Sequence, residues 1–245
     1  MTIRLGVASD PFPIAVPGDL ASVEGNAALG YPLNIGFFNF SSQRYQQVYD
    51  ASQFTLMPGG GYITAISFRV NGTLGPFTST LPDVQLDLST TPKTPGDLSL
   101  TFADNVGADD TVVYRRGALT LSGSGGGKPN PFDVTITLTT PFHYDPAQGN
   151  LLLDVRNFGG GQTTQFDATS QYGDVLSRVF TDVSGVGSPV ADGSASSGLV
   201  TQFTVEAPEP STAALLALGL AALLRVGHRA TAVSRRSERS PCGRE

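Results

Sequence analysis

The chain has 245 residues, of which 40% are hydrophobic and 15% charged, so it can bury the core of one sizeable domain and carry a short appendage. Its net charge of −6 is unevenly divided, with a balance of −10 up to Leu224 and of +4 from Arg225 onward. An acidic body repels nucleic-acid phosphates, which argues against a nucleic-acid partner, and the single cysteine, Cys242, excludes an intramolecular disulfide and a redox pair.

The first residues contain no recognisable secretory signal peptide, because residues 1–10 lack a continuous apolar stretch. The C-terminal features described below make sense in a protein that reaches a membrane, so we expect the natural start to lie upstream. Residues 1–26 are interpreted as an N-terminal arm. Pro11, Pro13 and Pro17 leave open whether this arm is a leading strand or a loose segment.

From residue 27 to 206 the pattern is that of an all-β domain. Val134, Ile136 and Leu138 alternate with polar residues, and this period of two is typical of a half-buried antiparallel strand. The candidate strands are 33–39, 44–49, 62–70, 84–89, 111–115, 119–122, 132–139, 151–157, 175–180 and 199–205. Clusters of glycine, proline and small polar residues separate them, notably at 58–61, 71–72, 123–127, 159–161 and 184–197. The pattern predicts an antiparallel two-sheet sandwich, jelly-roll-like, followed by one short C-terminal apolar helix.

Few residues offer catalytic chemistry. His143 stands in a predicted turn before a strand, where it could pair with Asp145 and a serine, but the chain has no Gly-x-Ser-x-Gly elbow. Paired carboxylates for glycoside hydrolysis cannot be assigned, because the acidic residues are scattered. We therefore expect no catalytic residues and no enzymatic activity, with a surface hydrolase as the alternative.

Three aspartates, Asp104, Asp109 and Asp110, lie in one turn-like stretch. Carboxylates clustered in an exposed loop can hold Ca²⁺, which takes roughly six to eight oxygen ligands. The spacing is not that of an EF-hand loop, and the alternative is an acidic turn whose carboxylates bond to nearby amides. Ca²⁺ bound by these residues is therefore the one cofactor considered, and no other metal is expected.

A carbohydrate-binding surface would stack sugar rings on aromatic side chains. The chain has no tryptophan, so Tyr31, Tyr45, Tyr49 and Tyr114 are the candidate platforms. The alternative is that these tyrosines pack within the sheets. A sugar-binding module therefore stays open as an interpretation of the body.

Near the C-terminus an apolar segment is followed by arginines. Residues 211–224 carry no charge and no polar stripe, and as a helix they reach about 20 Å, short of a hydrocarbon core of about 30 Å. Arg225, Arg229, Arg235 and Arg236 come next. The positive-inside rule places such a cluster in the cytoplasm and the β domain outside. We therefore expect a short transmembrane helix over residues 212–224.

Pro208, Glu209 and Pro210 precede this segment. Two prolines keep the chain extended and prevent the helix from continuing backward, which would present the tripeptide to a processing enzyme at the outer membrane face. The alternative is a C-terminal helix packed on the domain, with the two prolines as a plain linker.

The tripeptide with Ser211 and Thr212, the apolar segment and the arginine cluster resemble the PEP-CTERM sorting signal of Gram-negative bacteria. The resemblance implies that exosortase, a membrane enzyme, recognises the tripeptide, cleaves there and passes the protein outward. It also implies an association with extracellular matrix and exopolysaccharide. Segments 44–54, 101–110 and 144–155 resemble stretches common in domains that carry this signal, and those domains have no agreed molecular activity.

These observations divide the chain into an N-terminal arm (1–26), a β-sandwich domain (27–206), the sorting signal with its transmembrane helix (207–229) and a basic cytoplasmic tail (230–245). We expect an exported, non-enzymatic protein of the cell surface or extracellular matrix, made as an inner-membrane precursor. The other interpretation is a carbohydrate- or calcium-binding module of the exopolysaccharide matrix.

Overall fold

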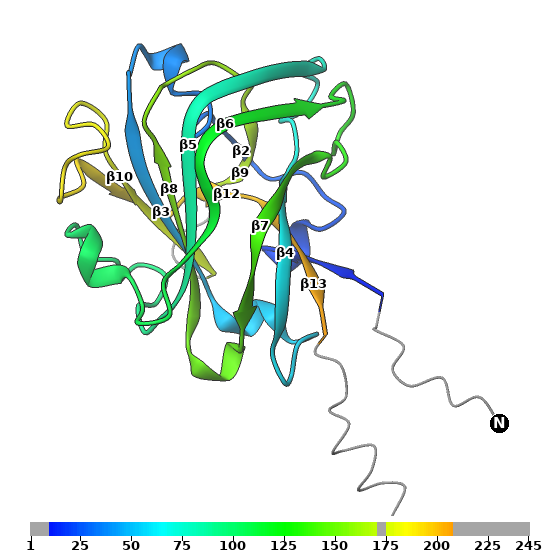
Figure 1. Ribbon diagram of the computed structural model, residues 1–245. Helices are drawn as coiled ribbons and strands as arrows, with labels where there is room; N and C mark the ends of the chain where they lie inside the picture. The colour runs from blue at the N-terminus through cyan, green and yellow to red at the C-terminus, as the bar shows by residue number, and fades with distance from the viewer. Residues whose placement is uncertain (1–9, 171–174, 208–245) are drawn as a thin grey trace, which may run out of the picture. The chain divides into compact units, whose positions relative to one another are not determined.

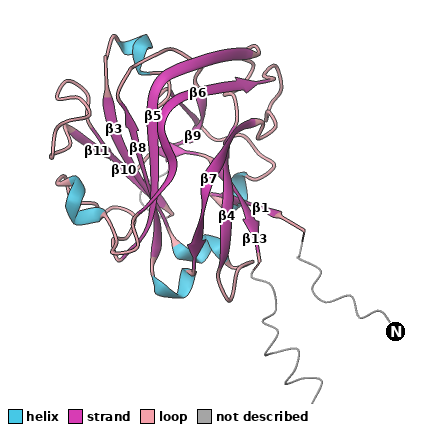
Figure 2. Cartoon of the chain, in the orientation of Figure 1, coloured by secondary structure: helices cyan, strands magenta, loops and turns pink. Residues whose placement is uncertain are grey.

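The computed structural model describes residues 10–170 and 175–207, which form an all-β body (Figure 1). The strands are β1 (Phe12–Val16), β2 (Ala27–Leu29), β3 (Gln43–Tyr49), β4 (Gly61–Phe68), β5 (Phe77–Thr91), β6 (Thr111–Gly123), β7 (Val134–Tyr144), β8 (Asn150–Asn157), β9 (Phe166–Thr169), β10 (Leu176–Phe180), β11 (Gly193–Ala195), β12 (Gly198–Leu199) and β13 (Thr201–Glu206). Figure 2 shows helical turns only as short segments between described strands, namely η1 (Gly18–Leu20), η2 (Ile35–Phe38), η3 (Ala51–Phe54), η4 (Phe102–Asn105) and η5 (Pro146–Gln148). The predicted all-β class is confirmed.

The described strands form three antiparallel sheets. The larger two have the strand orders β1-β13-β4-β7 and β11-β10-β3-β8-β5-β6, and the third is β12-β9-β2. The chain alternates between the larger sheets, since β3, β5, β6 and β8 belong to one and β4, β7 and β13 to the other. Such alternation is typical of jelly-roll-like sandwiches. The small third sheet was not predicted, because its strands of two to four residues are too short to show a period.

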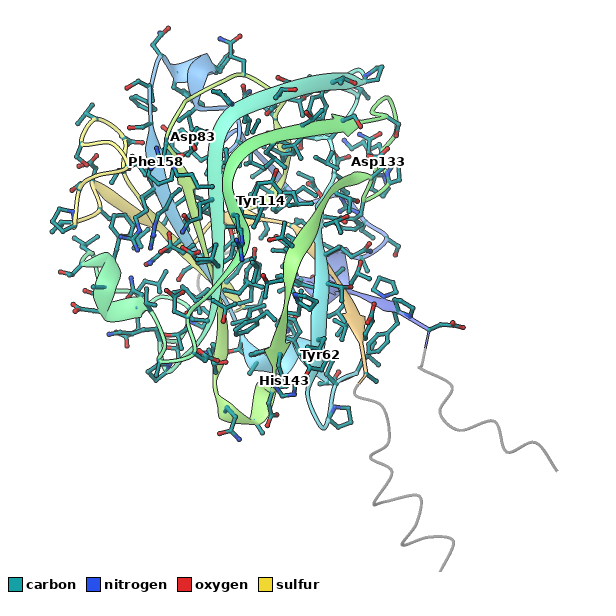
Figure 3. The ribbon with its side chains drawn as sticks, in the orientation of Figure 1. Tyr62, Asp83, Tyr114, Asp133, His143 and Phe158 are labelled. Atoms are coloured by element: carbon teal, nitrogen blue, oxygen red, sulfur yellow. The ribbon has the colours of Figure 1, made fainter. Side chains whose placement is uncertain are left out.

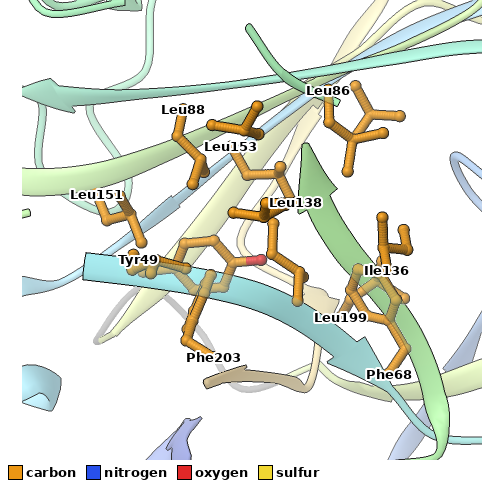
Figure 4. Close-up of a cluster of buried hydrophobic side chains, with 14 of the residues drawn as sticks. Tyr49, Phe68, Leu86, Leu88, Ile136, Leu138, Leu151, Leu153, Leu199 and Phe203 are labelled. Atoms are coloured by element: carbon orange, nitrogen blue, oxygen red, sulfur yellow. The ribbon is translucent and has the colours of Figure 1, made fainter. Parts of the chain in front are cut away.

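Side chains from both larger sheets meet in one hydrophobic core (Figure 4). The rings of Tyr49 on β3 and Phe203 on β13 lie edge to face with centroids 5.0 Å apart, which joins the two sheets across the core. Phe54 adds a third buried ring, 5.5 Å from that of Phe203. The two larger sheets therefore share one continuous apolar interior, as a sandwich requires.

The alternation on β7 is confirmed. Val134, Ile136 and Leu138 are buried, whereas the threonines between them are exposed. The strand continues to Tyr144, beyond the predicted end at residue 139. The predicted strands 111–115 and 119–122 are joined in the same way, since β6 runs through Gly117 without a break.

The predicted strand 33–39 is wrong. This segment forms the helical turn η2, which ends at Asn39 in a left-handed conformation (φ 61°). The Gly36 amide donates to the carbonyl of Gly161 at 2.8 Å, and a Cβ at Gly36 would lie 2.8 Å from the same oxygen. The apolar residues 33–39 therefore belong to a loop whose close contact with the loop of Gly161 requires glycine at position 36. Phe37, at 62% exposure, faces solvent.

The arm predicted for residues 1–26 includes a paired strand. β1 pairs with β13 in antiparallel register, from Phe12 opposite Val205 to Val16 opposite Thr201. Pro13 is tolerated because β1 is an edge strand, where one side needs no amide donor. The arm was predicted to be either a leading strand or a loose segment, and residues 12–16 form a strand.

A buried ion pair holds the segment that follows β1. Arg69 Nε donates to Asp167 Oδ2 at 2.6 Å, and the side chains are 1% and 0% exposed. Arg69 also donates to the Leu20 carbonyl at 3.0 Å, while Asp167 accepts from the Gly25 amide at 2.9 Å. A Cβ at Gly25 would lie 2.1 Å from the Ala168 carbonyl oxygen, so only glycine fits this approach.

Candidate functional site

The predicted sorting residues 208–212, the apolar segment 212–224 and the arginines 225, 229, 235 and 236 lie outside the described residues. The structure does describe the segment to which they are attached. β13 ends at Glu206, and both Glu206 and Ala207 are exposed. In the described ranges 10–170 and 175–207, no helix has the length and apolar character needed to cross a membrane.

His143 lies in a strand, and the predicted turn at this position is wrong. It belongs to β7 opposite Tyr62 of β4, with the two rings 5.1 Å apart at the surface (Figure 3). Asp145 serves the following turn instead, since its carboxylate accepts from the Ala147 amide at 3.0 Å and from the Gln148 side chain at 3.3 Å. Among the described residues, no hydrogen bond or ion pair joins His143 to Asp145.

The three aspartates considered for Ca²⁺ have separate roles. Asp104, in η4, accepts from the Ser99 hydroxyl at 2.9 Å, and Asp109 accepts from the Thr90 amide at 2.7 Å. Burial and the nearby Asp154 raise the pKa of Asp110. Nowhere in the part of the chain that the structure describes do three or more histidine, cysteine, aspartate or glutamate side chains gather as a metal ion would require.

The candidate sugar platforms differ in exposure. Tyr45 and Tyr49 are fully buried, so packing is the correct interpretation for these two. Tyr114 donates its hydroxyl to the Ala118 carbonyl at 2.7 Å. Tyr31 is partly exposed and lies beside Phe38 and Phe180, with ring centroids 5.0 and 5.4 Å away. Tyr31 is therefore the platform candidate that belongs to an aromatic surface.

The six-stranded sheet carries a network of buried charges that the sequence analysis did not predict. Asp87 on β5 and Asp154 on β8 stand opposite each other, and they are 1% and 2% exposed. Arg44 contacts Asp154 at 2.5 Å. Arg156 lies 3.5 Å from Asp87 and 3.6 Å from Asp154. Two carboxylates and two arginines thus neutralise one another.

The loop between β5 and β6 covers this network. The Arg44 guanidinium carbon lies 4.6 Å from the ring centroid of Phe102 in η4, and Gln46 donates both to the Phe102 carbonyl (3.2 Å) and to Asp154 (2.8 Å). The two carboxylates are therefore closed off from solvent. Their position supports a structural role in holding the loop on the sheet.

Asp87 makes stability depend on pH. Burial raises its pKa from 3.8 to about 6, against the opposing effects of Gln85 and Arg156. A carboxyl group whose pKa is higher in the folded chain destabilises the fold above that pKa, and the penalty disappears as pH falls toward the unfolded value. We therefore expect the free energy of unfolding of the parent, relative to Asp87→Asn, to rise by about 2 kcal/mol between pH 7 and 4.

Urea unfolding of the full-length parent and the Asp87→Asn variant at several pH values measures this difference. The comparison reports Asp87 together with its coupling to Asp154 and Asp110, while the contributions of more distant titrating groups cancel. Parallel stability curves for the two proteins between pH 4 and 7 would show that Asp87 has an ordinary pKa in the folded chain.

Comparison with known protein families matches residues 206–229 to the PEP-CTERM protein-sorting motif. The match begins at Glu206, the last residue of β13, and therefore follows directly on the folded body. No curated protein matches the chain. The resemblance of the C-terminal segment is confirmed, and the chain carries the PEP-CTERM protein-sorting motif of membrane-anchored precursors that exosortase processes and sorts to the cell surface.

Proposed function

We propose that this protein is a non-enzymatic component of the cell surface or extracellular matrix, delivered as an inner-membrane precursor. The observation that carries the proposal is the sorting motif at residues 206–229 immediately after the last strand of the sandwich. In this proposal residues 212–224 anchor the precursor, the arginines from Arg225 onward stay in the cytoplasm, and the sandwich is outside. Exosortase cleaves at the tripeptide and releases the sandwich.

The tripeptide is the part of the motif that the proposal can test most directly. Replacing Glu209 with glutamine, or Pro208 and Pro210 together with alanine, removes the charge or the extended backbone that a processing enzyme would recognise. We expect the uncleaved full-length chain to accumulate in the membrane fraction of a bacterium that has exosortase. Immunoblots of membrane, surface and medium fractions measure both size and location.

Glu238→Gln is the matched control. It makes the same chemical change in the basic tail, beyond the matched residues 206–229, and we expect normal processing. Normal maturation of both the Glu209→Gln chain and the double-proline variant would refute the proposed role of the tripeptide.

A second candidate function for the body is the binding of extracellular carbohydrate. It is favoured by a serine-lined cavity beside the buried Arg178. This function is compatible with sorting, since a sugar-binding body would hold the released protein in the matrix.

A further inference from the structure

Arg178 is a buried arginine without a carboxylate partner. It lies on β10 next to the edge strand β11 and is 9% exposed. The ion pairs in the described part of the chain involve other arginines, namely Arg44, Arg69, Arg116 and Arg156. An arginine is charged at every physiological pH, so this position keeps a buried positive charge.

The surroundings of Arg178 stabilise the charge without neutralising it. Its guanidinium carbon lies 4.7 Å from the ring centroid of Phe180 and 5.9 Å from those of Tyr31 and Tyr45, so three rings make cation–π contacts with it. The phenol of Tyr45 stays neutral, because burial raises the pKa of Tyr45 to about 12. Nε and Nη1 have no hydrogen-bond acceptor, and Nη2 donates to the Ser197 hydroxyl at a long 3.3 Å. The rings stabilise the charge, but no carboxylate neutralises it, so an anion beside it would be favourable.

A cavity of about 510 Å³ adjoins this side chain. Its volume falls within the roughly 300–1,000 Å³ of small-molecule sites. Apart from Arg178, most of its lining is serine, contributed by Ser170, Ser177, Ser194, Ser196 and Ser197. Ser197 is also the residue that Arg178 Nη2 reaches, so the guanidinium group meets the cavity at this wall.

The lining serines leave hydrogen-bonding capacity for a ligand. The Ser170 hydroxyl donates a hydrogen bond to Asn26 Oδ1 at 3.2 Å, and the Ser177 hydroxyl accepts one from the Gly96 amide at 2.9 Å. In the described residues, no partner is found for the hydroxyls of Ser194 and Ser196. Each hydroxyl can donate one hydrogen bond and accept two, which matches the capacity of sugar hydroxyls.

We propose that this cavity, called here the serine–arginine cavity, binds an acidic sugar of the hexuronate type. The carboxylate lies against Arg178 Nη2 and supplies the missing negative charge, while the ring hydroxyls bond to Ser194, Ser196 and Ser197. An apolar carboxylate fits less well, because serine hydroxyls would lose their bonds to water without gaining new ones. The inference deepens the second candidate function and does not depend on the sorting step.

Calorimetric titration of the full-length chain in non-ionic detergent with glucuronate tests the proposal, and a polygalacturonate oligomer distinguishes a polymer ligand from a free sugar. We expect a dissociation constant that is roughly millimolar for the single sugar. Glucose, which has the same ring without the carboxylate, and acetate, which has the carboxylate without the ring, should each bind at least about tenfold more weakly. Binding of acetate as tight as that of glucuronate, or no binding of either uronate, would overturn the proposal.

Two variants locate the site. Arg178→Met removes the charge and keeps an apolar stem, and Ser196→Leu fills the cavity from a partly exposed position without touching the arginine. Each should weaken glucuronate binding at least about tenfold. Arg115→Met, the same change at an exposed arginine, should bind like the parent. Circular dichroism checks that each variant is folded, and parent-like binding by folded Ser196→Leu would overturn the assignment even if Arg178→Met fails to fold.

The readouts of sorting and binding are separate. Arg178→Met should be processed and released like the parent, because the change lies outside the matched residues 206–229. Failure of glucuronate binding alone therefore refutes the cavity assignment, whereas failure of processing in the Glu209→Gln test concerns the sorting proposal.

Discussion

Asp167→Asn is expected to lower the free energy of unfolding by about 3–5 kcal/mol, because it leaves the buried Arg69 guanidinium without its counter-ion. The substitution preserves size and shape, so the loss comes from charge. Arg69 also anchors the Leu20 carbonyl, and Asp167 holds the Gly25 amide, so the segment between β1 and β2 should loosen as well. Urea unfolding followed by tyrosine emission measures the loss, since the chain has no tryptophan.

Two further chains sharpen this experiment. Arg69→Met combined with Asp167→Leu removes both charges and should be more stable than Asp167→Asn, since no buried charge is left unpaired. Asp83→Asn breaks an exposed pair, in which Arg116 and Asp83 are 55% and 31% exposed, and should shift the unfolding midpoint little (Figure 3). Equal effects of Asp167→Asn and Asp83→Asn would contradict the argument from burial.

Phe203→Ala is expected to destabilise the body by about 3–5 kcal/mol, through lost burial and the cavity that remains. Phe203 is fully buried on β13, and its ring touches Tyr49 of the facing sheet and Phe54 of η3. Strands on both sides of β13 prevent the sheet from collapsing onto the space. Denaturation of the parent and the variant under the same conditions gives the difference.

Phe37→Ala is the matched control for Phe203→Ala. The Phe37 ring is 62% exposed, so its removal should change the free energy of unfolding by less than about 0.5 kcal/mol. Similar losses for both variants would mean that the ring of Phe203 does not join the two sheets as the geometry indicates.

The sequence predicted the strands whose side chains alternate between apolar and polar. β3, β8 and β10 lie within a residue of their predicted bounds, and the alternation of β7 identified its buried side chains. It did not predict what depends on distant contacts. Asp87 alternates with Leu86 and Leu88, a pattern that favours a solvated position for the aspartate, but the loop with Phe102 and Asn105 covers that face.

The same distinction applies to the candidate sites, since the sorting motif was predictable from the sequence and the surroundings of Arg178 were not. The order of tripeptide, apolar segment and arginines is a property of the local sequence, and it is sufficient to identify the sorting motif without the fold. Arg178 offered no such signal, because a lone arginine in a strand is ordinarily solvated. Only the fold shows that Phe180, Tyr45 and the serines around Ser197 enclose it.

The first strand of the body has a single neighbour in its sheet, and that neighbour is the last strand. A chain that leaves the ribosome or a translocation channel amino end first would therefore hold β1 as an open edge until residues 201–206 emerge. The sheet cannot close early, and the sorting motif emerges together with the strand that closes it. The topology therefore sets the order of events, because the body can complete its fold only when the start of the sorting motif has been synthesised.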